Sequence, residues 1–126
     1  MAHDKEFAAS ASEIWLATNA ALECLEWSEI DSETEMPLDS FGYFFTEDSR
    51  MQVHDEVQSF ISDNSDDLHG MSYEQIGHDF ILTRNHHGAG FWDRGLGERG
   101  ERLTSAAHAY GGIRAYISGE TTLDIE

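Results

Sequence analysis

Residues 77–95 read GHDFILTRNHHGAGFWDRG, and this stretch decides which fold class the sequence predicts. Before it, hydrophobic residues recur every three or four positions, as they do on one face of a helix. Within it, residues 78–84 form a short apolar run, residues 85–90 contain the glycines of a reversal, and residues 91–94 resume an aromatic run. The pattern predicts a β-hairpin in the middle of the chain.

Two helices are expected on the N-terminal side of this hairpin. The first covers residues 5–28 and the second covers residues 46–68. Thr46 is a favourable N-cap for the second helix, and Gly70 is a natural stop. Residues 28–40 form an acidic connector between the two helices.

A third helix and a second hairpin are expected after the central hairpin. Residues 101–110 predict a short helix, and residues 113–118 and 121–125 predict two paired strands. The order αα-ββ-α-ββ indicates an α+β fold with a small, mainly antiparallel sheet. A length of 126 residues is typical of a single domain, with an acidic helical part at 1–76 and a sheet-forming part at 77–126.

The charge of the chain is its most unusual property, and it is unevenly distributed. The formal net charge is −18. Residues 1–79 hold 19 acidic side chains against Lys5 and Arg50, a net of −17, whereas residues 80–126 hold six acids against five arginines, a net of −1. Such a field repels nucleic acids and anionic membranes, so the expected partners are basic proteins. The five arginines are expected to pair with acids of the first two helices.

Acidic residues recur on the predicted outer faces of both N-terminal helices. Asp48, Asp55 and Asp66 are separated by seven and eleven residues. On one continuous helix they would lie about 10 Å and about 16 Å apart along the axis. Because duplex DNA carries one negative charge per ~1.7 Å of its axis, ordered carboxylates of this kind can imitate it. We expect Glu23, Glu26, Asp48, Asp55 and Asp66 to contact a partner. A solvated face or adaptation to high salt is the alternative.

Histidines and acids cluster in and around the predicted central hairpin. His78, His86, His87 and Asp93 are residue types that bind zinc, iron or nickel, and a hairpin would bring some of them together. The chain contains no HExxH or CxxC signature. A metal-binding domain or metal-dependent enzyme is therefore kept as an alternative, and structural or surface histidines, with no metal or other cofactor, are the expectation.

No complete catalytic motif is present, so we expect a binding protein and not an enzyme. The lone Cys24 lies among leucines on an apolar helical face, and Gly88-Ala89-Gly90 lacks the Lys-Ser/Thr ending of a P-loop.

No apolar run approaches the ~20 residues that span a membrane, and the N-terminus lacks the features of a secretory signal. A cytoplasmic protein is expected. The aromatic residues at 41–45 are expected in the core, with a dimer interface as the alternative.

Residues 77–95, together with LTSAAHAYG at 103–111, resemble a family of small acidic proteins encoded by bacteriophages and prophages. The segment ALECLEWSEIDSETEMPLD at 21–39 is similar to the N-terminal helix and connector of that family. His86 stands where the family pattern has Gly or a polar residue. The family is functionally uncharacterised, so the resemblance implies a phage setting inside a bacterial host cell. By analogy with acidic phage proteins that imitate DNA, the leading hypothesis is an anti-CRISPR-like inhibitor of a nucleic-acid-binding defence protein, such as a CRISPR effector or a restriction enzyme. A structural phage protein is a further alternative.

Overall fold

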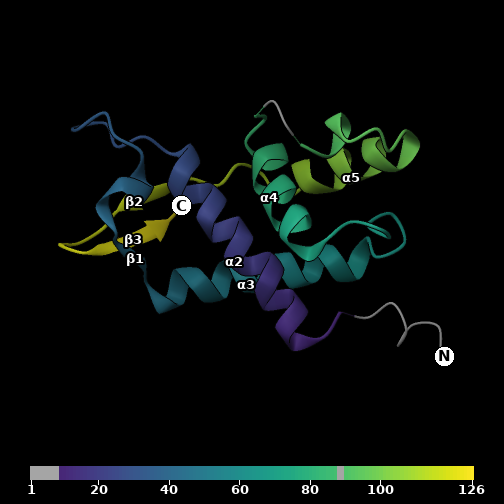
Figure 1. The fold of residues 1–126 in the computed structure, drawn as a ribbon, viewed down its shortest axis with the longest axis horizontal. Helices are drawn as coiled ribbons and strands as arrows, with labels where there is room; N and C mark the ends of the chain where they lie inside the picture. The colour runs from purple at the N-terminus through teal and green to yellow at the C-terminus, as the bar shows by residue number, and fades with distance from the viewer. Residues whose placement is uncertain (1–8, 88–89) are drawn as a thin grey trace.

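The structure, a computed structural model, describes residues 9–87 and 90–126 and has an α+β fold, as the sequence predicts (Figure 1). The described residues form four α-helices and one three-stranded sheet. The helices are α2 (Ala11–Ser28), α3 (Glu47–Asp63), α4 (Tyr73–Arg84) and α5 (Glu98–His108). The strands are β1 (Phe44–Phe45), β2 (Ala115–Ile117) and β3 (Thr122–Ile125), and short 3-10 helices occupy η1 (Leu38–Phe41) and η2 (Phe91–Asp93).

Side-chain caps determine where the first three helices begin. Ser10 and Glu13 form a capping box at the start of α2, so the predicted start at residue 5 is too early; residues 5–8 of that prediction lie outside the described residues. Thr46 caps α3 as predicted, by accepting a hydrogen bond from the backbone N–H of Ser49 at 3.3 Å. Ser72 caps α4 in the same way.

Helix α3 ends at Asp63, five residues before the predicted end. The following residues, 64–70, read NSDDLHG, and Ser, Asp and Asn side chains compete with the helical backbone for hydrogen bonds. Asn64 shows this competition, because its side-chain amide donates to the carbonyl of Phe60 at 2.9 Å. The chain leaves the helix there, although Leu68 still returns to the core.

The predicted central hairpin is wrong. Residues 78–84 belong to α4, and residues 91–93 form the 3-10 helix η2. Helix α4 is enclosed on most of its circumference, so its apolar residues follow one another without a helical period, and such a run cannot be told from a buried strand by periodicity. Gly77 permits the enclosure, because a Cβ there would meet the Ala17 carbonyl oxygen of α2 at 1.9 Å.

The C-terminal hairpin is confirmed, but the sheet also contains an unpredicted strand. Strands β2 and β3 are antiparallel, and β1 pairs with β3 in parallel, with Phe44 opposite Thr122. The sheet is therefore mixed, in the order β1-β3-β2. Because it takes strands from residues 44–45 and 115–125, it is not confined to the part of the chain after residue 77. Of the aromatic cluster at 41–45, Phe44 is 76% exposed and the other three aromatics pack against the core.

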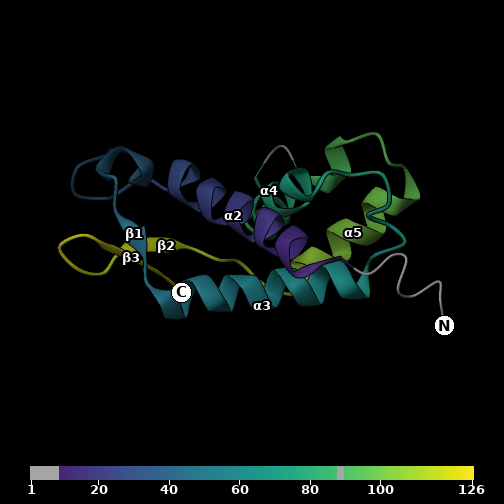
Figure 2. The same cartoon turned by 60° about the horizontal axis from the view of Figure 1, so that its bottom comes forward.

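Helix α2 lies across α3 and packs against both α3 and α4, as Figures 1 and 2 show. The small sheet lies at one end of the molecule and α5 at the other (Figure 2). Under α2, the Phe60 ring stacks on Phe80 at 4.5 Å and on Phe91 at 5.5 Å. Cys24 is fully buried in this core, and burial raises the pKa of its thiol to about 12, so it is a packing residue and not a nucleophile.

None of the helices in the described parts of the chain is both long and apolar enough to cross a membrane.

Candidate protein-interaction site

The five arginines of residues 80–126 all bind other parts of the chain. Four of them form ion pairs with carboxylates, and Arg99 donates to the backbone carbonyl of His69 at 2.9 Å. The pairing expected from the sequence is confirmed for Arg84, whose partner Glu56 lies on α3, whereas Glu29 and Asp67 lie beyond the ends of α2 and α3 and Asp79 lies on α4. The four ion pairs are Arg84–Glu56, Arg94–Asp79, Arg102–Asp67 and Arg114–Glu29.

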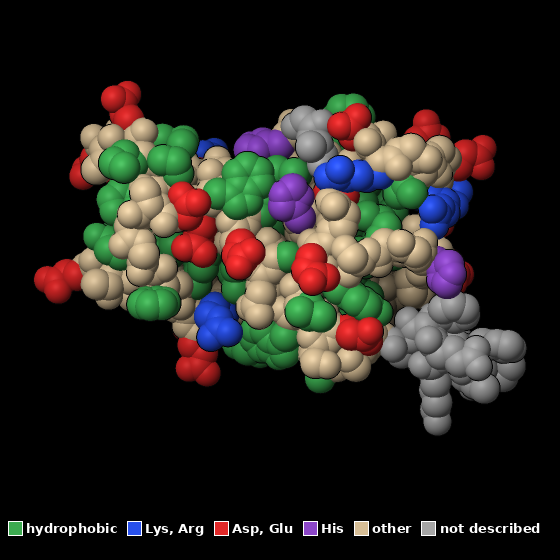
Figure 3. Space-filling view, viewed as in Figure 1, with side chains coloured by type: hydrophobic (Ala, Val, Ile, Leu, Met, Phe, Trp, Pro, Cys, Tyr) green, Lys and Arg blue, Asp and Glu red, His purple; other side chains and the backbone are tan. Residues whose placement is uncertain are grey.

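These contacts engage the guanidinium groups within the chain, although the side chains of Arg102 and Arg114 are still 55% and 67% exposed. In the two described ranges, Arg50 is the one further Lys or Arg, and its guanidinium lies 5.4 Å from the Trp15 ring centroid. The other carboxylates therefore face solvent without arginine partners. Figure 3 shows acidic side chains on the face that carries α2 as separate red groups, with apolar and neutral polar surface between them.

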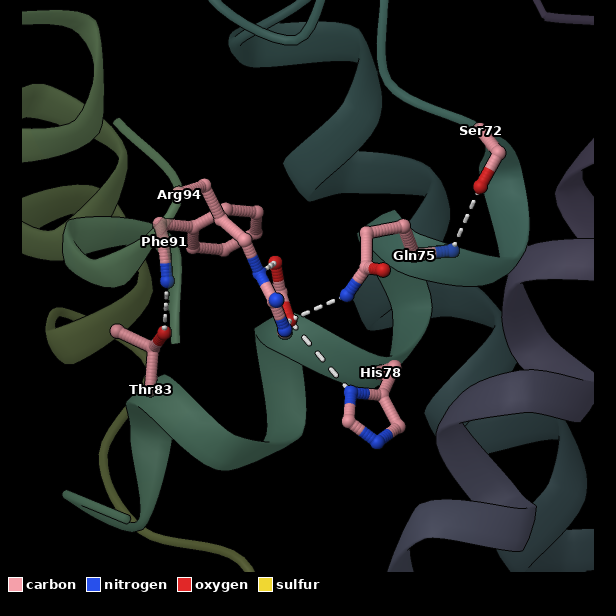
Figure 4. Close-up of polar contacts among 7 residues, drawn as sticks. Ser72, Gln75, His78, Thr83, Phe91 and Arg94 are labelled. Carbon is pink, nitrogen blue, oxygen red and sulfur yellow. Dashed lines mark hydrogen bonds and ion pairs between the residues drawn. The ribbon is translucent and has the colours of Figure 1, made fainter. Parts of the chain in front are cut away.

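The ion pair between Asp79 and Arg94 contains the most deeply buried carboxylate of the four. Asp79 is fully buried, and its two oxygens accept hydrogen bonds from Arg94 at 2.9 Å and 2.8 Å. Gln75 donates to the same carboxylate at 2.7 Å, and Nδ1 of His78 lies 3.5 Å from it. In Figure 4 the side chains of Gln75, His78 and Arg94 converge on this carboxylate. The hydrogen bond to Asp79 raises the pKa of Arg94.

A hollow of about 470 Å³ opens above this ion pair, between α2 and the N-terminal half of α4. The Trp27 ring stacks on the His78 ring, with centroids 5.5 Å apart, and the Trp27 side chain remains 45% exposed. Two carboxylates, those of Glu23 and Glu74, line the same hollow. The full lining is Leu16, Asn19, Ala20, Glu23, Trp27, Ser72, Glu74, Gln75, His78 and Arg94.

Next to the hollow, three carboxylates lie close enough to repel one another. Glu26 is half-buried, and its pKa is raised first by burial and then by the charges of Asp39 and Glu23. Asp39 comes from η1, at the end of the acidic connector. The fold therefore concentrates negative charge where α2 meets the connector.

The structure places the five predicted contact residues in two groups. Glu23 and Glu26 lie on α2 at the hollow, as described above. Asp48 and Asp55 are exposed on α3, whereas Asp66 is exposed beyond the end of α3. Because α3 stops at Asp63, the three aspartates do not form the continuous helical row that the sequence predicts, and the 16 Å spacing does not apply to Asp66.

The four candidate metal ligands are not brought together. His78 lies in α4, His86 and His87 follow the end of that helix, and Asp93 lies in η2. The His86 ring instead contacts the His108 ring, with centroids 4.3 Å apart. Among residues 9–87 and 90–126, no three His, Cys, Asp or Glu side chains are arranged to hold a metal ion. Gly88-Ala89 of the predicted reversal lies outside the described residues.

The sequence interpretation missed most of the hollow. Trp27 and Glu74 line the hollow and Asp39 lies next to it, and none of the three was a candidate, because they come from three segments that meet only where α2 crosses α4 and contacts the connector. One signal was available: Trp27 follows Glu23 by four residues, a spacing that places both on one side of a helix.

No protein-family model, curated protein or solved structure matches this chain. The chemistry of the site must therefore come from its own residues. Asp79 is held by Arg94 on both oxygens and is not free to act as a base. The exposed side chains that line the hollow include the carboxylates of Glu23 and Glu74 and the indole of Trp27, all of which can bind cations.

Proposed function

We propose that this chain is a phage-encoded inhibitor that binds a basic, nucleic-acid-handling protein of its bacterial host, of the CRISPR-effector or restriction-enzyme type. Its carboxylates would occupy positions where that protein holds DNA phosphates. The observation that carries the proposal is that all five C-terminal arginines are engaged in contacts within the chain. In the described part of the chain, and apart from Glu29 and Glu56, the carboxylates of α2, the connector and α3 have no ion pair with these arginines.

Repulsion among these carboxylates supports an external partner. Burial raises the pKa of Glu26, and the charges of Asp39 and Glu23 raise it further. Solubility alone does not require such crowding, because dispersed charges provide it with less repulsion. Lysines and arginines of a partner would neutralise the group and would also accelerate association at low salt.

Adaptation to high salt explains the distribution of charge less well. It favours acids over the whole surface, whereas 19 of the 25 acids here lie in residues 1–79. The resemblance of residues 77–95 to phage proteins favours an inhibitor further, since phages use acidic proteins against host defence. That argument is an analogy at the level of source and charge.

A release assay tests the proposal. Proteins from a bacterial lysate are bound to immobilised duplex DNA and challenged with this chain at low salt. We expect the chain to release a small set of DNA-binding proteins, with strong dependence on salt. Release of nothing beyond what bovine serum albumin releases would contradict the proposal.

Two double charge reversals locate the contact. Glu23→Lys with Glu26→Lys tests α2, and Asp55→Lys with Asp66→Lys tests the α3 side. Glu101→Lys with Glu120→Lys is the matched control, because it makes the same change of net charge at exposed positions elsewhere. We expect the control to retain release and at least the α2 variant to lose it. An equal reduction of release in all three variants would show that only net charge acts, and undiminished release by all three would contradict the proposal.

A further inference from the structure

The hollow beside α2 has features that a general acidic surface does not need. It is concave, with a volume of about 470 Å³, and it has an aromatic wall. One face of the Trp27 indole is covered by His78, and the side chain is still 45% exposed. An indole with an accessible face binds a cation with about 0.5–2 kcal/mol of stabilisation.

The charge of the hollow selects for a cation. Glu23 and Glu74 contribute two carboxylates. The charge of Arg94 is balanced by buried Asp79, which holds the guanidinium through both oxygens. The lining therefore has an excess of negative charge, and phosphates, nucleotides and carboxylate ligands are repelled from it.

The remaining lining suits a side chain with an apolar stem and a planar head. Leu16 and Ala20 provide apolar surface for methylene groups. Gln75 directs its amide nitrogen at Asp79, and Figure 4 shows its amide oxygen pointing away from that carboxylate. Asn19 adds a second amide. An arginine carries five N–H donors in one plane and stacks on indole rings, whereas a lysine ammonium is smaller and more strongly hydrated.

We propose that this hollow receives one arginine side chain of the partner, with the guanidinium against Trp27 and paired to Glu23 and Glu74. The inference rests on the proposed function, and it names the residue type by which the partner is recognised. In a nucleic-acid-handling protein such an arginine would be one that otherwise contacts phosphate.

A peptide titration followed by NMR tests the hollow directly. The probes are acetyl-Gly-Arg-Gly-amide, its lysine counterpart and its citrulline counterpart, which keeps the shape of arginine without the charge. The indole N–H signal of Trp27 is assigned with a Trp27→Phe variant. We expect saturable shifts with the arginine peptide at a Kd on the order of millimolar, weaker binding of lysine and none of citrulline. Equal shifts with arginine and citrulline, or no saturation with arginine, would overturn the proposal.

Substitutions then separate this inference from the proposed function. Glu74→Gln is expected to weaken binding of the arginine peptide about tenfold, whereas Glu98→Gln on α5, which lies outside the hollow, should leave it unchanged. Thermal melting of both variants shows whether they are folded. If the peptide does not bind while the chain releases proteins from DNA, the hollow proposal fails and the proposed function stands. If the peptide binds and nothing is released from DNA, the proposed function fails and the arginine site stands.

Discussion

Two regions of this molecule differ in how much of their polar surface is available to a partner. The segment 77–94 is dense in histidine, aspartate, arginine and glycine, and its histidines and Asp93 were the alternative metal site. Helix α2 carries Glu23 and Glu26, which were expected to contact a partner. In the structure, the buried polar groups of segment 77–94 bind other parts of the chain, while the acids of α2 face outward beside a hollow. Reactive residue types thus indicate function only where their polar groups remain available.

The difference follows from how much of each helix is covered. Because α4 is enclosed, its polar side chains must find partners within the protein. Thr83 accepts the backbone N–H of Phe91 at 3.1 Å, and Arg84 donates to the Gly111 carbonyl at 2.8 Å. Helix α2 is covered on one side only, so the exposed Glu23 and Trp27 are not required to form hydrogen bonds within the protein.

The largest expected effect is the loss of the cation that pairs with the buried Asp79 carboxylate in segment 77–94. Arg94→Met leaves the carboxylate of Asp79 buried without its cation, at an expected cost of about 3 kcal/mol. That cost lowers the melting temperature by roughly 10 °C for a domain of this size. Urea denaturation measures it. The double variant Asp79→Asn with Arg94→Met should recover part of the loss, and a loss below about 1 kcal/mol in the single variant would show that Asp79 is solvated.

Gly77→Ala tests whether α2 and α4 are in close contact. The added Cβ would overlap the Ala17 carbonyl oxygen, so the helices must separate, and we expect a loss of about 2 kcal/mol in the free energy of unfolding. Gly112→Ala is the control, because its Cβ would meet Asn85 at an ordinary 3.5 Å. Equal stability of the two variants would contradict the packing described here.

The change of stability with pH tests whether the acidic groups at α2 destabilise the folded protein at neutral pH. The pKa of Glu26 is raised in the folded protein, so the folded state takes up a proton more readily than the unfolded chain. Stability should therefore rise as the pH falls from 7 towards 5. The pKa of Asp67 is lowered below its ordinary 3.8 by Arg102, so the stability it contributes is lost as the pH falls through that lowered value. Melting curves between pH 7 and pH 2 should pass through a maximum, and Glu26→Gln should flatten the rise. A steady fall from pH 7 would contradict this account.

The smallest expected effect concerns His86, where the sequence departs from the phage family pattern. Its φ is 57°, in the left-handed region that favours glycine. We expect His86→Gly to stabilise the protein by less than about 1 kcal/mol, since relief of backbone strain is offset by a more flexible unfolded chain. Gly111→Ala, at a φ of 78°, is the reciprocal variant and should destabilise by about 1 kcal/mol. A destabilised His86→Gly would indicate that the contact with His108 outweighs the strain.

The sequence predicts the parts of the fold that depend on local signals. The periodicity of α2, the cap and periodicity of α3, the helix α5 and the β2–β3 hairpin are recognisable in this way, whereas the Ser10 cap of α2 was missed. The sequence of α4 predicted a strand because, in a helix buried on most sides, hydrophobic residues no longer recur only at every third or fourth position. Strand β1 has two residues and forms only by pairing with β3, so no local sequence pattern predicts it.

The residues of the candidate site also fall into those that the sequence could predict and those that it could not. Glu23 and Glu26 could be named from charge and helical position. Glu74 and Asp39 could not, because distant segments meet only through the crossing of the helices. The five arginines of residues 80–126 were also predicted only in part. Their pairing with acids was predictable from composition, but the acid with which each one pairs was not.

The most direct test of the central claim is the release of DNA-binding proteins from immobilised duplex DNA by the wild-type chain and by the variant Glu23→Lys with Glu26→Lys. Both are compared at low salt, after melting curves have shown that the variant is folded. We predict release by the wild type, loss of at least nine-tenths of it in the variant, and its retention in Glu101→Lys with Glu120→Lys. Undiminished release by the α2 variant would contradict the assignment of this surface to the partner.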